Sequence, residues 1–318
     1  MSYQIIRFIF ILHLVGQKHL FRRELKMNRK DRMAGVLFGV ACGDALGATL
    51  EFTILEKNHK MVTDIVGGGV FNLKPGETTD DTAMTLMVAE GILENSKDPI
   101  NTIGNKFVEW ANSSPKDIGV ICLEAINNFN MCGDWTLASK ITHQTAGGLS
   151  AGNGTLMRTA PIAFYNDYNE MVKQTRNISK MTHWDDKASD ACIIYNKIIY
   201  KLLNGEDKDK SILSEIQNTQ YVNVLKMEKN DLKPSGYVVD TFNCVLWCCL
   251  ANNNFKDAII EIANLCGDAD TTAAIAGGLM GAAYGLEGIP NEWVNKIIIK
   301  DDINNLLSKF NSNEKFNK

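Results

Sequence analysis

The amino-acid sequence predicts an all-α protein, and two features of the 318-residue chain carry this prediction. Apolar residues recur at intervals of three and four through most of the chain, as on one face of a helix, and only 6 prolines interrupt them. No stretch shows a convincing alternation of apolar and polar residues, the pattern of half-buried strands. We therefore expect one helical domain over residues 31–310, preceded by an N-terminal extension (1–30) and followed by a polar tail (311–318).

Composition limits the partners and the compartment. A formal net charge of -4 leaves no basic footprint for nucleic acid. The apolar stretch Phe8–Val15 is much shorter than the roughly 20 residues that a membrane-spanning helix needs. The 8 cysteines show no paired C-x-x-C spacing, and most lie in apolar helical patterns, as reduced core residues do. We expect a cytoplasmic monomer that contacts neither nucleic acid nor membrane.

Glycine recurs every four residues in two stretches, which places each set in one stripe on a helix. A glycine inside a helix costs about 1 kcal/mol relative to alanine, so we expect the close approach of a second helix to offset that cost. The two helices are then predicted to cross at their glycines, bringing Asp44 and Glu51 near Asp268 and Asp270. The alternative is a coincidental run of small residues. The stripes are Gly35, Gly39, Gly43 and Gly47, and Gly277, Gly281 and Gly285.

Two acidic clusters, each just before an apolar helical pattern, suggest a metal site. They are Thr79-Asp80-Asp81-Thr82 and Gly267-Asp268-Ala269-Asp270-Thr271-Thr272. Charges rarely lie beside buried helices unless they are paired or bind a metal. Carboxylate and hydroxyl oxygens suit Mg²⁺ or Mn²⁺, and four acids could neutralise two such ions. The alternative is that these residues only cap helix N-termini.

Three further features are open to two readings each. The glycine-rich loop 147–154 could bind an anion through its backbone N–H groups, or it could be a plain turn. His183 could hydrogen-bond a sugar or phosphate, although a lone histidine is most often structural. Glu51 could be a helix cap, or a general acid or base if the glycine crossing brings it to the metal acids.

Several of these motifs, taken together, resemble the ADP-ribosylglycohydrolases, in particular the dinitrogenase-reductase-activating type. The resemblance runs from about Met33 to Pro290 in the same order. It implies a single compact domain of orthogonal helices with a binuclear Mg²⁺ or Mn²⁺ centre. It also implies removal of ADP-ribose from a modified protein side chain, an arginine in the type family. The motifs are the glycine run 35–51, the segments 67–82 and 152–161, Ser235-Gly236-Tyr237-Val238-Val239-Asp240-Thr241, and the acidic cluster at 267–272.

The resemblance also implies site residues. Glu51 and Asp117 would be catalytic, with Asp117 near the scissile bond. The loop Ser150, Gly152, Asn153 and Gly154 would hold the diphosphate, His183 would contact the ribose, and Tyr237 would face the adenine. The metal ligands would be Thr79, Asp80, Asp81, Asp268, Asp270 and Thr271.

The chain departs from the family pattern at a few positions. Val120, Ile121 and Cys122 stand where polar residues are usual, which leaves the preferred leaving group open, and Thr78 replaces a usual tryptophan. The predicted function is a metal-dependent hydrolase acting on ADP-ribosylated proteins or small ADP-ribosyl compounds. The alternatives are a catalytically silent ADP-ribose-binding module and a binuclear-metal phosphoesterase acting on nucleotides. Turnover assays separate all three.

Overall fold

The computed structural model describes residues 27–55 and 60–316, and within them the chain is built from helices. The described residues contain no strand, only two isolated bridges, Gly68 to Leu73 and Gly152 to Tyr237. The prediction of an all-α fold is therefore confirmed. Most of the predicted N-terminal extension falls on residues 1–26, which lie outside the described residues.

Two helices pack along their glycines at the centre of the molecule: α2 (Arg29–Gly47) and α12 (Ala269–Tyr284). A Cβ atom added at Gly39 would lie 2.1 Å from the carbonyl oxygen of Gly277, and one added at Gly281 would lie 1.9 Å from the oxygen of Gly35. These separations leave no room for any side chain. The predicted glycine contact between the two helices is confirmed, and it offsets the low helix propensity of glycine.

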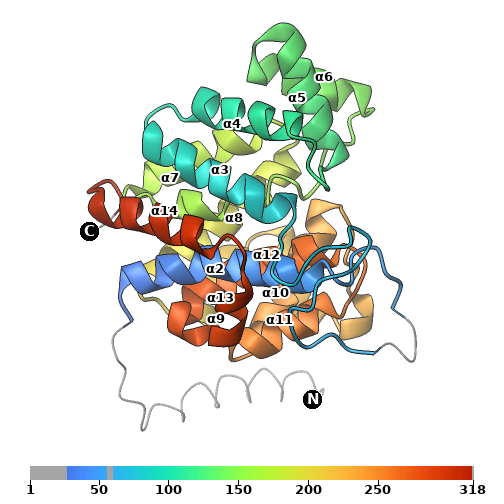
Figure 1. Cartoon of the computed structure of the whole chain (residues 1–318), viewed down its shortest axis with the longest axis vertical. Coiled ribbons are helices and arrows are strands. Elements are labelled where there is room, and N and C mark those ends of the chain that lie inside the picture. The colour runs from blue at the N-terminus through green and yellow to red at the C-terminus, as the bar shows by residue number, and fades with distance from the viewer. Residues whose placement is uncertain (1–26, 56–59, 317–318) are drawn as a thin grey trace.

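The other helices surround this central pair. In Figure 1, α3 and α14 lie on one side of α2, α11 and α13 lie on the other, and α5 and α6 form the end of the long axis. No helix among the described residues is both long enough and apolar enough to cross a membrane. The helices are α3 (Asp80–Glu94), α4 (Ile100–Asn112), α5 (Val120–Cys132), α6 (Trp135–Thr145), α7 (Tyr168–Ser179), α8 (Asp186–Leu203), α9 (Lys208–Ile216), α10 (Val238–Ala251), α11 (Phe255–Ala263), α13 (Asn291–Lys296) and α14 (Lys300–Ser312), with short 3₁₀ turns η1 (Ala160–Phe164), η2 (Gln220–Lys226), η3 (Lys229–Asp231) and η4 (Leu286–Gly288).

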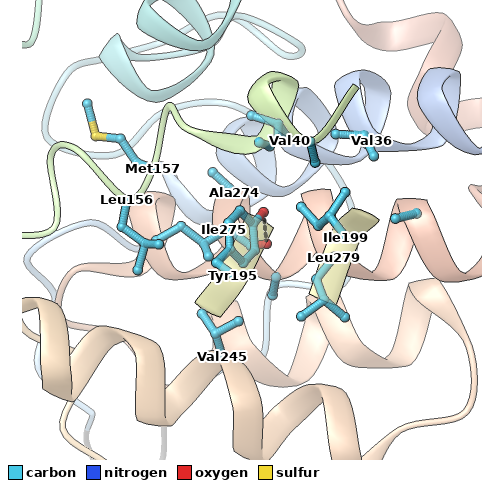
Figure 2. Packing of buried hydrophobic residues seen from close by; sticks show 14 of the residues in the cluster. Val36, Val40, Leu156, Met157, Tyr195, Ile199, Val245, Ala274, Ile275 and Leu279 are labelled. Atoms are coloured by element: carbon cyan, nitrogen blue, oxygen red, sulfur yellow. Dashed lines mark hydrogen bonds between the residues drawn. The ribbon is translucent and has the colours of Figure 1, made fainter. Parts of the chain in front are cut away.

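Apolar side chains from α8 and α10 close over the free face of α12, as Figure 2 shows. Tyr195 is fully buried there, and its hydroxyl donates a hydrogen bond to the carbonyl oxygen of Ile275 at 2.8 Å. A buried phenol needs such a partner, because an unsatisfied polar group in an apolar core is costly. Helix α12 is thus packed against α2 on one face and against α8 and α10 on the other.

Both ends of the domain differ from the predicted boundaries. Helix α2 begins at Arg29, whose guanidinium donates to the backbone oxygens of Phe164 and Phe316. Phe316 is fully buried and packs edge-on against Phe310. The polar tail predicted from 311 therefore contains an apolar anchor, and the packed structure extends from Arg29 to Phe316. The polar residues around Phe316 conceal this anchor in the sequence.

Candidate active site

The two acidic clusters meet at Asp81. Its Oδ2 atom accepts a hydrogen bond from the Thr79 hydroxyl at 3.3 Å and another from the Thr271 hydroxyl at 3.2 Å. One carboxylate, fully buried, thus joins the start of α3 to the start of α12 across 190 residues of sequence. The two clusters face the same point.

Asp44 on α2 fixes the first of these clusters. Its carboxylate accepts from the backbone N–H groups of Thr79 and Thr82 at 3.0 and 3.1 Å, and from both threonine hydroxyls. The first N–H groups of a helix lack partners within the helix, so Asp44 acts as the cap of α3 from outside. We predicted Asp44 beside Asp268 and Asp270, but its hydrogen bonds are instead to the α3 cluster.

Glu51 plays the matching part at α12. Its Oε2 atom accepts from the backbone N–H of Ala269 at 2.8 Å and from that of Asp270 at 3.4 Å. The neighbouring backbone is fixed by two hydrogen bonds, from Phe52 N to Gly267 O at 2.7 Å and from Gly267 N to Thr53 O at 3.0 Å. The Asp268 side chain makes no capping hydrogen bond.

Gly267 is required for this turn. Its φ of 67° lies in the left-handed region, and an added Cβ would lie 2.2 Å from the carbonyl oxygen of Pro234. Cys266, just before it, has a φ of 62°, and Phe52, just after Glu51, has a φ of 55°. Non-glycine residues in this region are strained and cluster at functional sites. The backbone is bent on both sides of the contact between Glu51 and α12.

Carboxylates crowd together around this point. Oxygen atoms of Glu51, Asp268 and Asp270 lie within 4.8 Å of one another. Glu51 shares a side-chain hydrogen bond with Asp270. On the α3 side, Asp80 hydrogen-bonds Asp117 and accepts from the Gly119 N–H at 3.1 Å. Two carboxyl groups this close favour keeping a proton over both being charged, because like charges repel.

Burial and mutual repulsion raise the pKa values of these acids. Desolvation raises the pKa of Glu51 to about 7 and that of Asp44 to about 6. The pKa values of Asp80, Asp81 and Asp270 lie well above the usual range, first because of burial and second because of neighbouring carboxylates. Burial also raises the pKa values of Asp117 and Asp268. Charged carboxylates this close together require a cation.

The cluster fits a hard divalent cation. Asp81 Oδ1 is buried and has no hydrogen-bond partner, whereas most buried carboxylate oxygens have at least one. All its neighbours in the cluster offer oxygen atoms, the donors that Mg²⁺ and Mn²⁺ prefer. An unpaired buried oxygen among acids with raised pKa values indicates a position that a cation would satisfy.

A cavity of about 220 Å³ is lined by most of these acids, namely Glu51, Asp80, Asp117, Asp268 and Asp270. Glu51, Asp117 and His183 all line this cavity, whereas Thr79 and Asp81 do not line it, and the Thr79 hydroxyl donates to Asp81 Oδ2. Val120, Ile121 and Cys122 form an apolar section of the wall beside Asp117. The lining residues are Glu51, Phe52, Asp80, Asp117, Gly119, Val120, Ile121, Cys122, Gly152, Asn153, Gly154, Met157, His183, Gly236, Asp268, Asp270 and Thr271.

The glycine-rich loop is attached to the acids by Asn153. Its Nδ2 group donates to Asp268 Oδ2 at 2.7 Å and to the Thr241 hydroxyl at 3.0 Å. Its backbone N–H donates to the Gly236 oxygen at 3.0 Å and so is not available to an anion. Gly152 and Gly154 line the cavity against His183, whose Nε2 would lie 3.0 Å from a Cβ added at Gly152.

Ser150 and Tyr237, which the sequence placed in the substrate site, are not among the residues lining the cavity. The Ser150 hydroxyl is fully buried and lies 2.7 Å from His143 Nδ1. The backbone of Tyr237 forms a bridge with Gly152, the residue is 39% exposed, and the Lys187 ammonium group lies over its ring. Ser150 acts here on the fold of the loop, whereas Tyr237 lies at the surface next to it.

Sequence reasoning missed Arg158 as well as the true partner of Asp44. Arg158 is fully buried behind the cavity and donates to the Gly154 oxygen at 2.9 Å. A lone arginine within the apolar run 156–163 was the available signal, because buried charges need partners.

The fold and the site define a class of protein: an all-α scaffold that holds a buried carboxylate cluster, suited to divalent cations, at the floor of a cavity. The family model for ADP-ribosylglycohydrolase matches residues 25–316. This chain belongs to the ADP-ribosylglycohydrolase family, as the sequence motifs predicted.

Individual relatives agree with this assignment. The chain is 35% identical over 289 residues to ADP-ribosylarginine hydrolase Tri1 of Pseudomonas putida (strain GB-1), covering 88% of this chain and 77% of that protein. It is 31% identical over 276 residues to ADP-ribosyl-(dinitrogen reductase) glycohydrolase of Rhodospirillum rubrum, covering 85% and 91%. A solved structure of an ADP-ribosylglycohydrolase-related protein complex superposes with a TM-score of 0.77 at 28% identity, covering 89% of this chain and 97% of that chain.

Proposed function

We propose that this protein hydrolyses the glycosidic bond between ADP-ribose and a modified protein side chain, with arginine favoured, and that two Mg²⁺ or Mn²⁺ ions assist it. The convergence of the two acidic clusters on Asp81 is the observation that supports the proposal most directly. The names of the Pseudomonas and Rhodospirillum relatives, an ADP-ribosylarginine hydrolase and an ADP-ribosyl-(dinitrogen reductase) glycohydrolase, support the choice of bond.

The cations would be held by the oxygen atoms of both clusters. When bound, they would neutralise the charges of the carboxylates and lower the pKa of a water molecule that serves as the nucleophile. Asn153 helps to orient the Asp268 carboxylate through its hydrogen bond, and Asp44 holds Thr79 in place from behind. The proposed ligands are Thr79, Asp80, Asp81, Asp268, Asp270 and Thr271.

Glu51 and Asp117 would move the protons. Glu51 has a pKa near 7, so at neutral pH it can both accept and give a proton. Asp117 has a raised pKa and stands beside the apolar wall of Val120 and Ile121. From that position it would protonate the departing nitrogen or oxygen as positive charge develops on the sugar.

The rest of the substrate would follow the loop. Gly152 and Gly154 let a diphosphate approach the backbone closely, and His183 faces the same space. Ser150 would shape the loop from behind, and the exposed ring of Tyr237 offers a surface for the adenine. Because all 8 cysteines are free, we also propose a reducing, cytoplasmic setting. The net charge of -4 fits a protein without nucleic-acid partners, and we propose a monomer that does not bind membranes.

The test uses Asp268→Ala and Asp270→Ala. We expect both variants to lose Mn²⁺ binding and release of ADP-ribose from arginine-modified protein, while circular dichroism keeps its helical signal. Asp301→Ala is the matched control, because Asp301 is an exposed acid in the first turn of α14. Unchanged hydrolysis in both site variants would refute the proposal.

The wild-type protein decides between the alternatives. ADP-ribose binding without turnover on arginine-modified, serine-modified and small ADP-ribosyl substrates would favour a binding module. Phosphate release from a nucleotide panel would favour a phosphoesterase.

A further inference from the structure

A buried arginine, a threonine and a histidine form a chain of hydrogen bonds behind the cavity. Arg158 Nη2 donates to the Thr182 hydroxyl oxygen at 2.8 Å, and that oxygen lies 2.8 Å from His183 Nδ1. All three side chains are at least 98% buried. Arg158 Nη1 also holds the Gly154 carbonyl oxygen, so the same guanidinium connects the loop and the histidine.

The direction of each hydrogen bond follows from chemistry. A guanidinium has no acceptor lone pair, so Arg158 must donate and the Thr182 oxygen must accept. The Thr182 hydroxyl hydrogen is then left to donate, and His183 Nδ1 lies 2.8 Å away in position to accept it. An Nδ1 atom that accepts cannot carry a proton, which places the proton of the neutral ring on Nε2.

The ring is neutral across the working range of pH. Burial, together with the positive charge of Arg158, lowers the pKa of His183 to about 3. Its Nε2 side faces the cavity: a Cβ added at Gly152 would lie 3.0 Å from Nε2, and one at Gly154 would lie 3.5 Å from it. Within residues 27–55 and 60–316 the only hydrogen bond of the His183 ring is made by Nδ1, so the Nε2–H group is available to a ligand.

We propose that Arg158 and Thr182 are positioning residues that lock His183 in the tautomer protonated on Nε2, so that His183 serves the cavity as a hydrogen-bond donor and never as a proton acceptor. The ligand class is an oxygen acceptor, a sugar hydroxyl or a phosphate oxygen, beside the glycine loop. The identity of that ligand as part of ADP-ribose rests on the proposed function. The lock itself is a property of the ligand-free protein.

One competing arrangement has to be tested. If His183 carried its proton on Nδ1, the Thr182 oxygen would accept twice and its hydrogen would need another acceptor. The Cys122 thiol is also within hydrogen-bonding reach of the Thr182 hydroxyl, which lowers the pKa of that thiol, but sulfur is a weak acceptor and Cys122 Sγ already accepts from Arg158 Nη1 at 3.4 Å. Replacing the thiol therefore distinguishes the two arrangements.

The first experiment is ¹⁵N NMR of the full chain labelled in its 5 histidines, with His183→Gln to assign the signals. We expect a His183 ring that is protonated on Nε2 and unprotonated on Nδ1 from pH 6 to 8. The same tautomer is expected in Thr182→Ser and in Cys122→Ala. Thr182→Val, which keeps the shape but loses the hydroxyl, is expected to populate both tautomers. An Nδ1–H ring in the wild type, or an unaltered ring in Thr182→Val, would overturn the proposal. If Thr182→Val does not fold, the wild-type and Cys122→Ala spectra decide.

The second experiment measures ADP-ribose affinity by calorimetry with Mg²⁺ present. Thr182→Val is expected to bind about three- to tenfold more weakly, the worth of one hydrogen bond, and to raise KM with little change in kcat. Thr182→Ser is expected to restore affinity. Should the wild-type ring show the predicted tautomer while ADP-ribose fails to bind, the proposed function falls and the lock stands. Should ADP-ribose bind equally well to all variants, His183 is not its donor.

Discussion

The N-termini of α3 and α12 use the same device with different results. Each helix begins with acids that point into the site, and each is capped by an acid from α2 or the residues just after it. Asp44 caps α3 through four donors and is fully buried. Glu51 caps α12 through two backbone donors, one of them long at 3.4 Å, and it lines the cavity.

The difference separates a structural acid from one that can react. Asp44 has its carboxylate surrounded by donors and lines no part of the cavity. Glu51 has one oxygen on the helix while its carboxyl shares a hydrogen bond with Asp270, and its pKa lies near 7. External capping explains why Thr79 and Asp268, at the N-cap positions, make no side-chain capping hydrogen bond of their own, although Asp270 still accepts the Thr271 N–H at 2.7 Å.

The largest effect is expected from Glu51→Gln. Glutamine keeps an acceptor oxygen for the Ala269 N–H but cannot exchange a proton. Loss of a general acid or base lowers kcat by roughly 10²- to 10⁴-fold, and we expect a fall in that range with near-normal Mn²⁺ binding and, with the metal bound, an unchanged melting temperature. Activity within a few-fold of wild type would show that Glu51 is only a cap, as Asp44 is.

Asp44→Ala is expected to act on stability. It leaves the N–H groups of Thr79 and Thr82 buried without a partner, and each such group costs about 1–3 kcal/mol. The free energy of unfolding should fall by about 3 kcal/mol, measured by urea denaturation. Asp44→Asn retains one acceptor oxygen and should lose about half as much. An Asp44→Ala protein with an unchanged free energy of unfolding but no activity would contradict this prediction. It would show that Asp44, and not only Glu51, takes part in catalysis.

The sequence could predict the glycine contact between α2 and α12 and the presence of the two acidic clusters, because both are local sequence patterns. A glycine at every fourth position leaves few packing solutions, and paired acids before apolar helices have few uses. The sequence could not predict which helix Asp44 caps, because α2 passes the N-termini of both α3 and α12. Only the packed geometry decides which backbone N–H groups the Asp44 carboxylate meets.

The substrate loop shows the same limit. Backbone pairing between Gly152 and Tyr237 turns the tyrosine ring outward, and a hydrogen bond to His143 occupies Ser150. Neither contact has a local sequence signal, since both join residues through the tertiary fold. Arg158 did have one, a charge in an apolar run, but its partners are a carbonyl oxygen and a hydroxyl that no pattern marks.

The smallest effect expected is the pH dependence of stability, and it separates Glu51 from the rest of the cluster. The pKa of Glu51 rises from 4.5 to about 7 on folding, so the native protein holds a proton that the unfolded chain releases. Its contribution to stability is present below pH 4.5 and is lost as pH rises through 7. His183, with a pKa near 3, contributes the opposite slope below its ordinary value of 6.5, so absolute stability is a poor measure. The difference between wild type and Glu51→Gln cancels that slope.

Without metal, this difference should fall by about 2 kcal/mol between pH 5 and pH 8, in urea denaturation with a chelator present. Saturating Mg²⁺ should remove the fall, because the cation competes with protons for the same cluster and binds best when the acids are charged. Asp301→Ala, on the surface of α14, should follow the wild-type curve at every pH. A difference that stays flat without metal would mean that Glu51 is already charged in the native protein. Its contact with Asp270 would then be satisfied by a neighbour's proton, and the role of proton carrier would pass to Asp117.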